Sequence, residues 1–218
     1  MKDNSAYYSQ SRPEMLALVP KEATCILDVG CGAGTFGVGL RERLPKARVF
    51  GVELFPEVAA EAPDCYEKVF VGDVDSVLKT LPDATYDLIV FNDLLEHLVD
   101  PRICLRECQR LLAPGGKILS SIPNMRFWPA LSDLIFQADW KYRDAGVMDE
   151  THLRCFTQKS IRRMFDECGY GVELMQGINK TWIVSWRWRI LNTLMLGGLQ
   201  DCLYPQFAVL VSPKKNHE

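Results

Sequence analysis

The segment that most constrains the fold is a short apolar run that leads directly into closely spaced glycines. The run Cys25–Val29 has the length of a buried strand, and glycines follow it at positions Gly30, Gly32 and Gly34. A helical pattern begins near Thr35. A strand, a glycine turn and a helix in this order open many α/β folds, and the glycine backbone lets a ligand approach the main chain. On their own, the glycines are equally consistent with a tight structural turn.

Further apolar runs alternate with helical patterns along the rest of the chain. One helix is expected from Asp100 to Pro114-Gly115-Gly116, and a second one from Thr157 to Gly169. This alternation predicts a mainly parallel sheet with helices on both of its faces. The expected strands are Cys25–Val29, Val49–Glu53, Lys68–Val71, Asp87–Phe91, Lys117–Ile122, Val172–Gln176 and Phe207–Val211.

Two segments do not fit this alternation. Residues 124–156 are too long for a simple connection and contain Trp128, Trp140 and Tyr142, so we expect a lid over a site. Residues 181–204, before the last strand, predict a helical insertion rich in Trp and Leu. The insertion can be a helical cover, a homodimer surface or a peripheral contact with a membrane. We expect a single domain over residues 1–218.

Composition excludes several classes of protein. The 218 residues carry a formal net charge of −3, so no general basic field favours nucleic acid as a partner. No apolar run is long enough to predict a transmembrane helix. The chain shows no signal peptide, and its eight cysteines have neither C-x-x-C spacing nor a disulfide pattern. These features predict a cytoplasmic protein whose cysteines serve as small apolar residues.

Acidic residues stand at the ends of the second and third expected strands. Glu53 lies about 20 residues after the glycine turn, where a carboxylate can accept hydrogen bonds from ribose hydroxyls. Asp73 follows the third strand and can accept a bond from an exocyclic amine. Thr35 occupies the position at which a dinucleotide fingerprint has its third glycine, which argues against a bound pyrophosphate. The pattern therefore indicates a nucleoside pocket.

In this order and spacing, the motifs of residues 25–178 resemble those of class I S-adenosylmethionine-dependent methyltransferases. The strand Asp87–Phe91 and the Leu112-Ala113-Pro114-Gly115-Gly116 segment complete the match. The resemblance implies a Rossmann-like three-layer sandwich with a seven-stranded, mainly parallel sheet whose last strand is antiparallel. It implies S-adenosylmethionine as cofactor and S-adenosylhomocysteine as product. The cofactor contacts that it implies are Asp28, Gly30, Cys31, Gly32, Gly34, Glu53, Leu54, Asp73, Val74 and Asn92, with Tyr8 and Arg12 near the cofactor carboxylate.

A narrower resemblance lies in two further segments. Ser121-Ile122-Pro123-Asn124 and the segment from Asp149 to Thr157 are similar to motifs of polysaccharide-associated methyltransferases with a D-x-T-H-L-R-F-F-T signature, although Cys155 replaces one Phe. The general layout also resembles MetW-type proteins. The resemblance implies O-methylation of a small-molecule or glycan acceptor. A non-catalytic cofactor-binding partner of MetW type and a nicotinamide-dependent oxidoreductase are the alternatives.

The catalytic base is sought among three residues, Asp93, His97 and His152. We take His152 as the catalytic residue because it ends the expected lid and an imidazole titrates near neutral pH. The alternative is a structural histidine that holds the lid. Asp93, Glu96, His97 and His152 also have the donor types of a metal site, as in methyltransferases with an E-x-x-E-H arrangement. The Leu95-Glu96-His97-Leu98 string is common in metal-free members, so we expect no metal.

Overall fold

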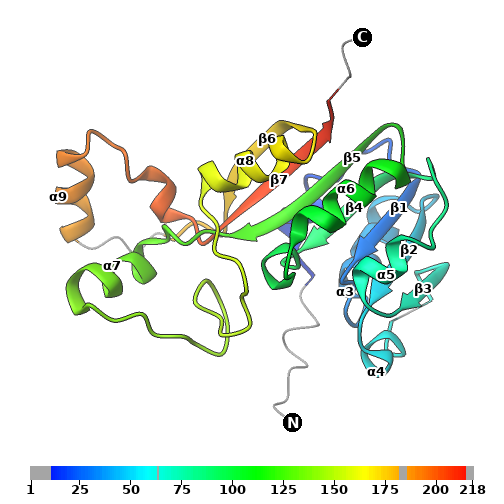
Figure 1. The fold of residues 1–218 in the computed structure, drawn as a ribbon, viewed down its shortest axis with the longest axis horizontal. Coiled ribbons are helices and arrows are strands. Elements are labelled where there is room, and N and C mark those ends of the chain that lie inside the picture. Colours follow the sequence, from blue (N-terminus) through cyan, green and yellow to red (C-terminus); the bar gives the residue numbers. More distant parts are fainter. Residues whose placement is uncertain (1–10, 63, 182–185, 215–218) are drawn as a thin grey trace.

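The computed structural model describes residues 11–62, 64–181 and 186–214. Seven strands form one sheet in the order β3-β2-β1-β4-β5-β7-β6 (Figure 1). Only β7 runs antiparallel to its neighbours, so the predicted fold class is confirmed. The strands are β1 (Cys25–Val29), β2 (Arg48–Glu53), β3 (Lys68–Val71), β4 (Tyr86–Asn92), β5 (Leu112–Pro123), β6 (Tyr170–Ile178) and β7 (Gln206–Pro213).

Helices cover both faces of the sheet, as Figure 1 shows for α5, α6 and α8 in front of the strands. Neighbouring residues of one strand face opposite layers, and both layers are apolar. In β1, Ile26 packs toward α2 and α3, whereas Leu27 packs toward α5 and α6. A strand buried on both faces reads as a continuous apolar run, which explains why these runs were visible in the sequence. The helices are α2 (Pro13–Leu16), α3 (Thr35–Arg43), α4 (Pro56–Ala59), α5 (Val74–Leu78), α6 (Pro101–Leu111), α7 (Trp128–Gln137), α8 (Gln158–Glu167) and α9 (Trp186–Leu194), with short 3₁₀ helices η1 (Leu95–His97) and η2 (Gln200–Leu203).

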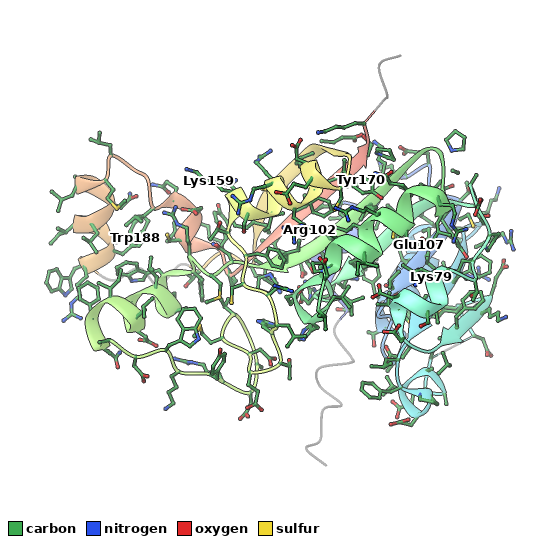
Figure 2. All side chains as sticks on the ribbon, in the orientation of Figure 1. Lys79, Arg102, Glu107, Lys159, Tyr170 and Trp188 are labelled. Atoms are coloured by element: carbon green, nitrogen blue, oxygen red, sulfur yellow. The ribbon has the colours of Figure 1, made fainter. Side chains whose placement is uncertain are left out.

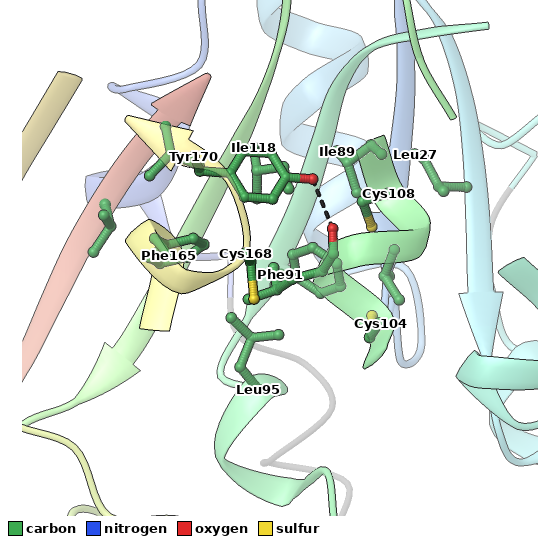
Figure 3. Packing of buried hydrophobic residues seen from close by; sticks show 14 of the residues in the cluster. Leu27, Ile89, Phe91, Leu95, Cys104, Cys108, Ile118, Phe165, Cys168 and Tyr170 are labelled. Atoms are coloured by element: carbon green, nitrogen blue, oxygen red, sulfur yellow. Dashed lines mark hydrogen bonds between the residues drawn. The ribbon is translucent and has the colours of Figure 1, made fainter. Parts of the chain in front are cut away.

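The larger core lies between the sheet and the α6–α8 layer (Figure 3). Phe165 of α8 meets Tyr170 of β6 edge to face, with ring centroids 6.2 Å apart. The buried Tyr170 hydroxyl donates a 2.7 Å hydrogen bond to the Leu105 carbonyl of α6. Cys104 and Cys108 are fully buried in the same core, and all eight cysteines are free, as expected for small apolar residues.

Both predicted helix starts are confirmed by capping bonds. Asp100 accepts a 3.1 Å bond from the Arg102 amide at the start of α6. At the start of α8, Thr157 and Ser160 each accept a bond from the other's backbone N–H, which satisfies two donors that the helix cannot use itself. The expected end of α6 at Pro114-Gly115-Gly116 is wrong. The helix ends at Leu111, and β5 begins at once because Leu112 pairs with Tyr86 of β4.

The insertion between β6 and β7 packs beside the segment predicted as a lid. That segment contains α7, and Trp128 of α7 shares a small core with Trp188 of α9. Trp188 is labelled in Figure 2. Trp188 is therefore a core residue. Trp186 is 67% exposed, and Ile190 and Leu194 are exposed as well. That this exposed face binds a second copy of the chain or a membrane surface stays a prediction. Within the described ranges, no helix is long and apolar enough to cross a membrane.

Candidate functional site

The strand order places one edge of the sheet where ligands bind in α/β folds. From the centre, β2 and β3 extend to one side of β1, while β4 and β5 extend to the other. Val29 at the end of β1 lies opposite Phe91 of β4, so Gly30 and Asn92 follow neighbouring strands. In open parallel sheets the ligand site lies outside the carboxyl ends of strands where the order reverses. The predicted cofactor residues after β1, β2, β3 and β4 all belong to this edge.

The glycine loop takes a backbone conformation that other residues avoid. Gly30, Gly32 and Gly34 have φ angles of 77°, 55° and 82°, in the left-handed region that costs other residues about 1–2 kcal/mol. The amides of Gly30 and Cys31 donate to the Val52 carbonyl of β2 at 2.8 and 3.0 Å. These bonds fix the loop against the neighbouring strand.

Glu53 ties the end of β2 to the same loop. Its carboxylate is buried, with Oε2 accepting a 3.0 Å bond from the Gly32 amide and Oε1 accepting one of 3.0 Å from the Phe55 amide. Each oxygen can accept a second bond, so ribose hydroxyls remain compatible with this position. The next residue, Leu54, is 53% exposed beside the loop.

Asp28 lies beneath the loop and is only 1% exposed. The Tyr66 hydroxyl donates a 2.7 Å hydrogen bond to its Oδ2. Burial raises the pKa of Asp28 to about 7, and the nearby Glu53 charge adds to the rise. Asp28 therefore supports the loop from inside, and its partner Tyr66 is a supporting residue that no sequence motif indicated.

Asp73 and Val74 begin α5 after the third strand. Asp73 is exposed and caps the helix, since Oδ2 accepts bonds of 3.1 and 3.0 Å from the amide and hydroxyl of Ser76. Its Oδ1 makes no hydrogen bond to another described residue, which leaves an acceptor for an exocyclic amine. Val74 is buried in the larger core. At this position the cap is certain, and the cofactor contact stays a prediction.

Asn92, the last residue of β4, has a buried amide without partners. Neither its Nδ2 nor its Oδ1 makes a hydrogen bond to any part of the chain that the structure describes. Leaving a buried polar group unpaired costs about 1–3 kcal/mol, and an amide at the end of a central strand can recover this cost by binding a ligand. Asn92, the open glycine backbone and the Glu53 carboxylate together fit a ligand with amino-acid and nucleoside parts.

Asp93 is held by surrounding groups and is unsuited to act as a base. Its carboxylate pairs with Arg12 and accepts bonds of 2.7 Å from the Ser121 hydroxyl and 2.9 Å from the Gln206 amide. Arg12, which we expected near the cofactor carboxylate, forms an ion pair with Asp93 across 81 positions of sequence. Its contact with the cofactor stays a prediction. Tyr8 lies outside the described residues.

The two other candidates for the base meet each other. The rings of His97 and His152 pack edge to face, with centroids 4.9 Å apart. Glu96 lies with them, and one ligand atom from each of the three side chains falls within 4.8 Å of the others. Burial raises the pKa of Glu96 well above its usual range. Burial and the neighbouring His97 lower the pKa of His152, which favours a neutral imidazole at pH 7.

Backbone hydrogen bonds hold the end of the predicted lid at this cluster. The Glu96 carbonyl accepts bonds of 2.9 and 3.0 Å from the amides of Leu153 and Arg154. The Arg154 guanidinium donates a 2.9 Å bond to the Val99 carbonyl. The His152-Leu153-Arg154 motif thus fastens the segment to η1, and this fastening brings His152 to His97.

A comparison of the sequence with known protein families identifies the family of this chain. Residues 2–174 match the family described as a methyltransferase domain. The chain belongs to this methyltransferase family. Family membership implies S-adenosylmethionine as the cofactor, which the unpaired Asn92 amide, the glycine loop and Glu53 fit. The polysaccharide-associated and MetW-type subfamilies stay predictions.

Two curated methyltransferases illustrate how much of the chain is shared. An uncharacterized methyltransferase of Schizosaccharomyces pombe is 34% identical over 109 residues, covering 45% of this chain and 39% of that protein. The malonyl-[acyl-carrier protein] O-methyltransferase of Herminiimonas arsenicoxydans is 32% identical over 108 residues, covering 50% of this chain and 40% of that protein. Across these and similar relatives, the chain spans 34% to 54% of their length.

One solved structure has a fold similar to that of this chain over the whole length of the chain. It is the complex between the Haloferax volcanii Trm112 methyltransferase activator and its methyltransferase partner, with a TM-score of 0.69 and 17% identity. The match covers 100% of this chain and 94% of that one. At this identity the likeness shows a shared fold.

Proposed function

We propose that this methyltransferase transfers a methyl group from S-adenosylmethionine to a hydroxyl of a small polar acceptor, with a glycan hydroxyl as the preferred class. The observation that carries the proposal is that residues predicted for the cofactor and residues suited to the acceptor lie next to each other at the end of β4. Asn92 on the cofactor side is followed within five residues by Glu96 and His97, to which the lid brings His152. The kinship to an O-methyltransferase over half of the chain supports oxygen as the methylated atom.

Each part of the edge has a separate task in this proposal. Bound S-adenosylmethionine supplies an already activated methyl group. The glycine loop gives the cofactor an open backbone, Glu53 binds the ribose hydroxyls and Asn92 binds polar groups near β4. Asp93, held by Arg12 and Ser121, keeps the turn after β4 in place.

On the acceptor side, His152 is the residue that we assign to the acceptor hydroxyl. His152 is half-buried. Its position is fixed because the next two residues, Leu153 and Arg154, donate backbone hydrogen bonds to the Glu96 carbonyl. Holding two reactants in an aligned geometry is worth up to about 7–11 kcal/mol of the barrier. The segment from residue 124 to 156 would then cover the reacting groups from water.

The test is acceptor-dependent formation of S-adenosylhomocysteine across a panel of sugars, hydroxy acids and phenols. We expect turnover with at least one hydroxyl acceptor. We also expect His152→Gln to lower kcat by at least about 10²-fold while the dissociation constant for S-adenosylhomocysteine stays within twofold of wild type. Lys159→Gln, an exposed change on α8, is the matched control (Figure 2).

Three results would contradict the proposal or one of its parts. Tight cofactor binding without turnover on any acceptor would support a non-catalytic partner of MetW type. Nicotinamide binding tighter than S-adenosylmethionine binding would support an oxidoreductase. Wild-type kcat in His152→Gln would remove His152 from the reaction.

A further inference from the structure

The buried carboxyl of Glu96 is the least satisfied polar group near the acceptor side. The side chain is fully buried, and neither Oε1 nor Oε2 makes a hydrogen bond to any described residue. Buried carboxyl groups are normally paired or bound to a metal. Among the residues that the structure describes, none supplies this partner to Glu96.

The two histidines beside Glu96 are oriented as metal-binding histidines usually are. Nδ1 of His97 donates to the carbonyl and hydroxyl oxygens of Thr151, each at 3.2 Å. The Thr151 hydroxyl in turn donates a 2.6 Å bond to Asp149. Nδ1 of His152 donates to the Val147 carbonyl at 3.3 Å. Because a carbonyl oxygen can only accept, these bonds place the proton of each ring on Nδ1 and make Nε2 the basic ring nitrogen, which is the form of imidazole that binds a metal.

We infer that Glu96, His97 and His152 form a binding site for a divalent first-row transition-metal ion. Their ligand atoms lie within 4.8 Å of one another. Ligand atoms stand about 2.0–2.2 Å from such an ion, so three of them end about 3–3.5 Å apart. The present spacing of up to 4.8 Å must therefore shorten when an ion binds.

The donor set and the surrounding charge select the kind of ion. Two imidazoles with one carboxylate suit Zn²⁺ or Fe²⁺, whereas Mg²⁺ and Ca²⁺ prefer oxygen ligands alone. The Asp149 carboxylate acts on Glu96 and favours a cation there. Arg12 opposes a cation at this position, but its charge is paired with Asp93.

Three protein ligands leave coordination positions open to an outside oxygen. A cation here can bind the acceptor hydroxyl and favour loss of its proton to solvent water before methylation, so that His152 acts on the hydroxyl through the ion and not as the base. An acceptor with two adjacent oxygens would fill two open positions and bind best. This role rests on the proposed function, whereas the metal site itself does not.

The test is calorimetric titration of the chelator-treated full chain with ZnCl₂ and CoCl₂, with MgCl₂ as comparator. We expect one Zn²⁺ or Co²⁺ per chain, weaker Mg²⁺ binding and a visible absorption band from bound Co²⁺. Glu96→Gln, His97→Gln and His152→Gln should each weaken Zn²⁺ binding by at least about tenfold. His217→Gln removes the third histidine of the chain, leaves the three ligands in place and should bind as wild type does.

S-adenosylhomocysteine binding reports in the same samples whether each variant is folded. A folded wild type that binds neither Zn²⁺ nor Co²⁺ would overturn the inference and leave the proposed function standing. The same holds if His217→Gln weakens binding as much as the cluster variants do. If Glu96→Gln fails to fold, His152→Gln, on the other segment of the cluster, decides the matter.

Discussion

Asp28 is a buried carboxyl whose charge the surrounding protein disfavours. Its pKa of about 7 in the folded state compares with about 3.9 for an exposed Asp. The folded state therefore keeps a proton that the unfolded chain releases, and the stability from this group is full below pH 4 and lost as the pH rises through 7. Asp28→Asn keeps an acceptor for Tyr66 and removes the titration.

We expect Asp28→Asn to become more stable relative to wild type as the pH rises from 5 to 8. A shift of about 3 pKa units corresponds to at most about 4 kcal/mol over the full range. Urea denaturation of both proteins at pH 5 and pH 8 measures the difference. Parallel pH profiles for the two proteins would show that Asp28 is ionised in the fold at both pH values.

Gly30 of the loop leaves little room for a side chain. Its φ is 77°, and an added Cβ would lie 3.3 Å from the Leu94 side chain. Gly115 in β5 has a φ of 81° with nothing near an added Cβ. A substitution of Gly115 would therefore cause similar backbone strain at a position away from the site.

We expect Gly30→Ala and Gly115→Ala to lower the free energy of unfolding by about 1–2 kcal/mol each. Only Gly30→Ala should also weaken S-adenosylhomocysteine binding, by about tenfold or more, because the loop must shift away from Leu94. Thermal unfolding and calorimetry measure the two effects. Equal affinities in the two variants would argue against a cofactor contact at the loop.

At the scale of helices and strands, the sequence predicted element types well and their ends less well. The bounds of β1 and β3 agree with the expected runs because apolar residues and turn residues alternate sharply there. The start of β5 was missed because Leu112 continues the apolar pattern of α6 while its backbone already pairs with β4. Helix periodicity reports which side chains are buried and does not report the backbone partner.

The packing of α6, α8 and β6 leads to a graded prediction for the core. Tyr170→Phe removes only the bond to the Leu105 carbonyl and should destabilise the fold by about 0.5–1.5 kcal/mol. Phe165→Ala leaves a cavity in the same cluster and should cost about 3–5 kcal/mol. Urea denaturation gives both values. A reversed order would mean that the hydrogen bond contributes more than the packing in Figure 3 implies.

For the whole molecule, residues far apart in sequence complete the site, and no spacing rule predicts their meeting. The edge at which the predicted cofactor residues gather could be predicted because most of them stand at or just after the end of a parallel strand. The pairing of Arg12 with Asp93 and the meeting of His152 with His97 depend on how α2 and the lid segment return to the end of β4. In the sequence Glu96 belonged to a common string, and it was distinguished by its burial without a hydrogen-bond partner among the described residues.

The central claim is that the strand-end edge with the glycine loop, Glu53 and Asp73 binds S-adenosylmethionine. The most direct measurement is calorimetric titration of wild type, Glu53→Gln and Asp73→Ala with S-adenosylhomocysteine, with NAD as a comparator ligand. Glu67→Gln, which changes an exposed carboxylate paired with Arg48, is the matched control. We predict one tight site in wild type, no binding of NAD, and a loss of about tenfold or more in Glu53→Gln and Asp73→Ala only. A folded wild type that does not bind S-adenosylhomocysteine, or a Glu67→Gln variant as weak as Glu53→Gln, would contradict the account.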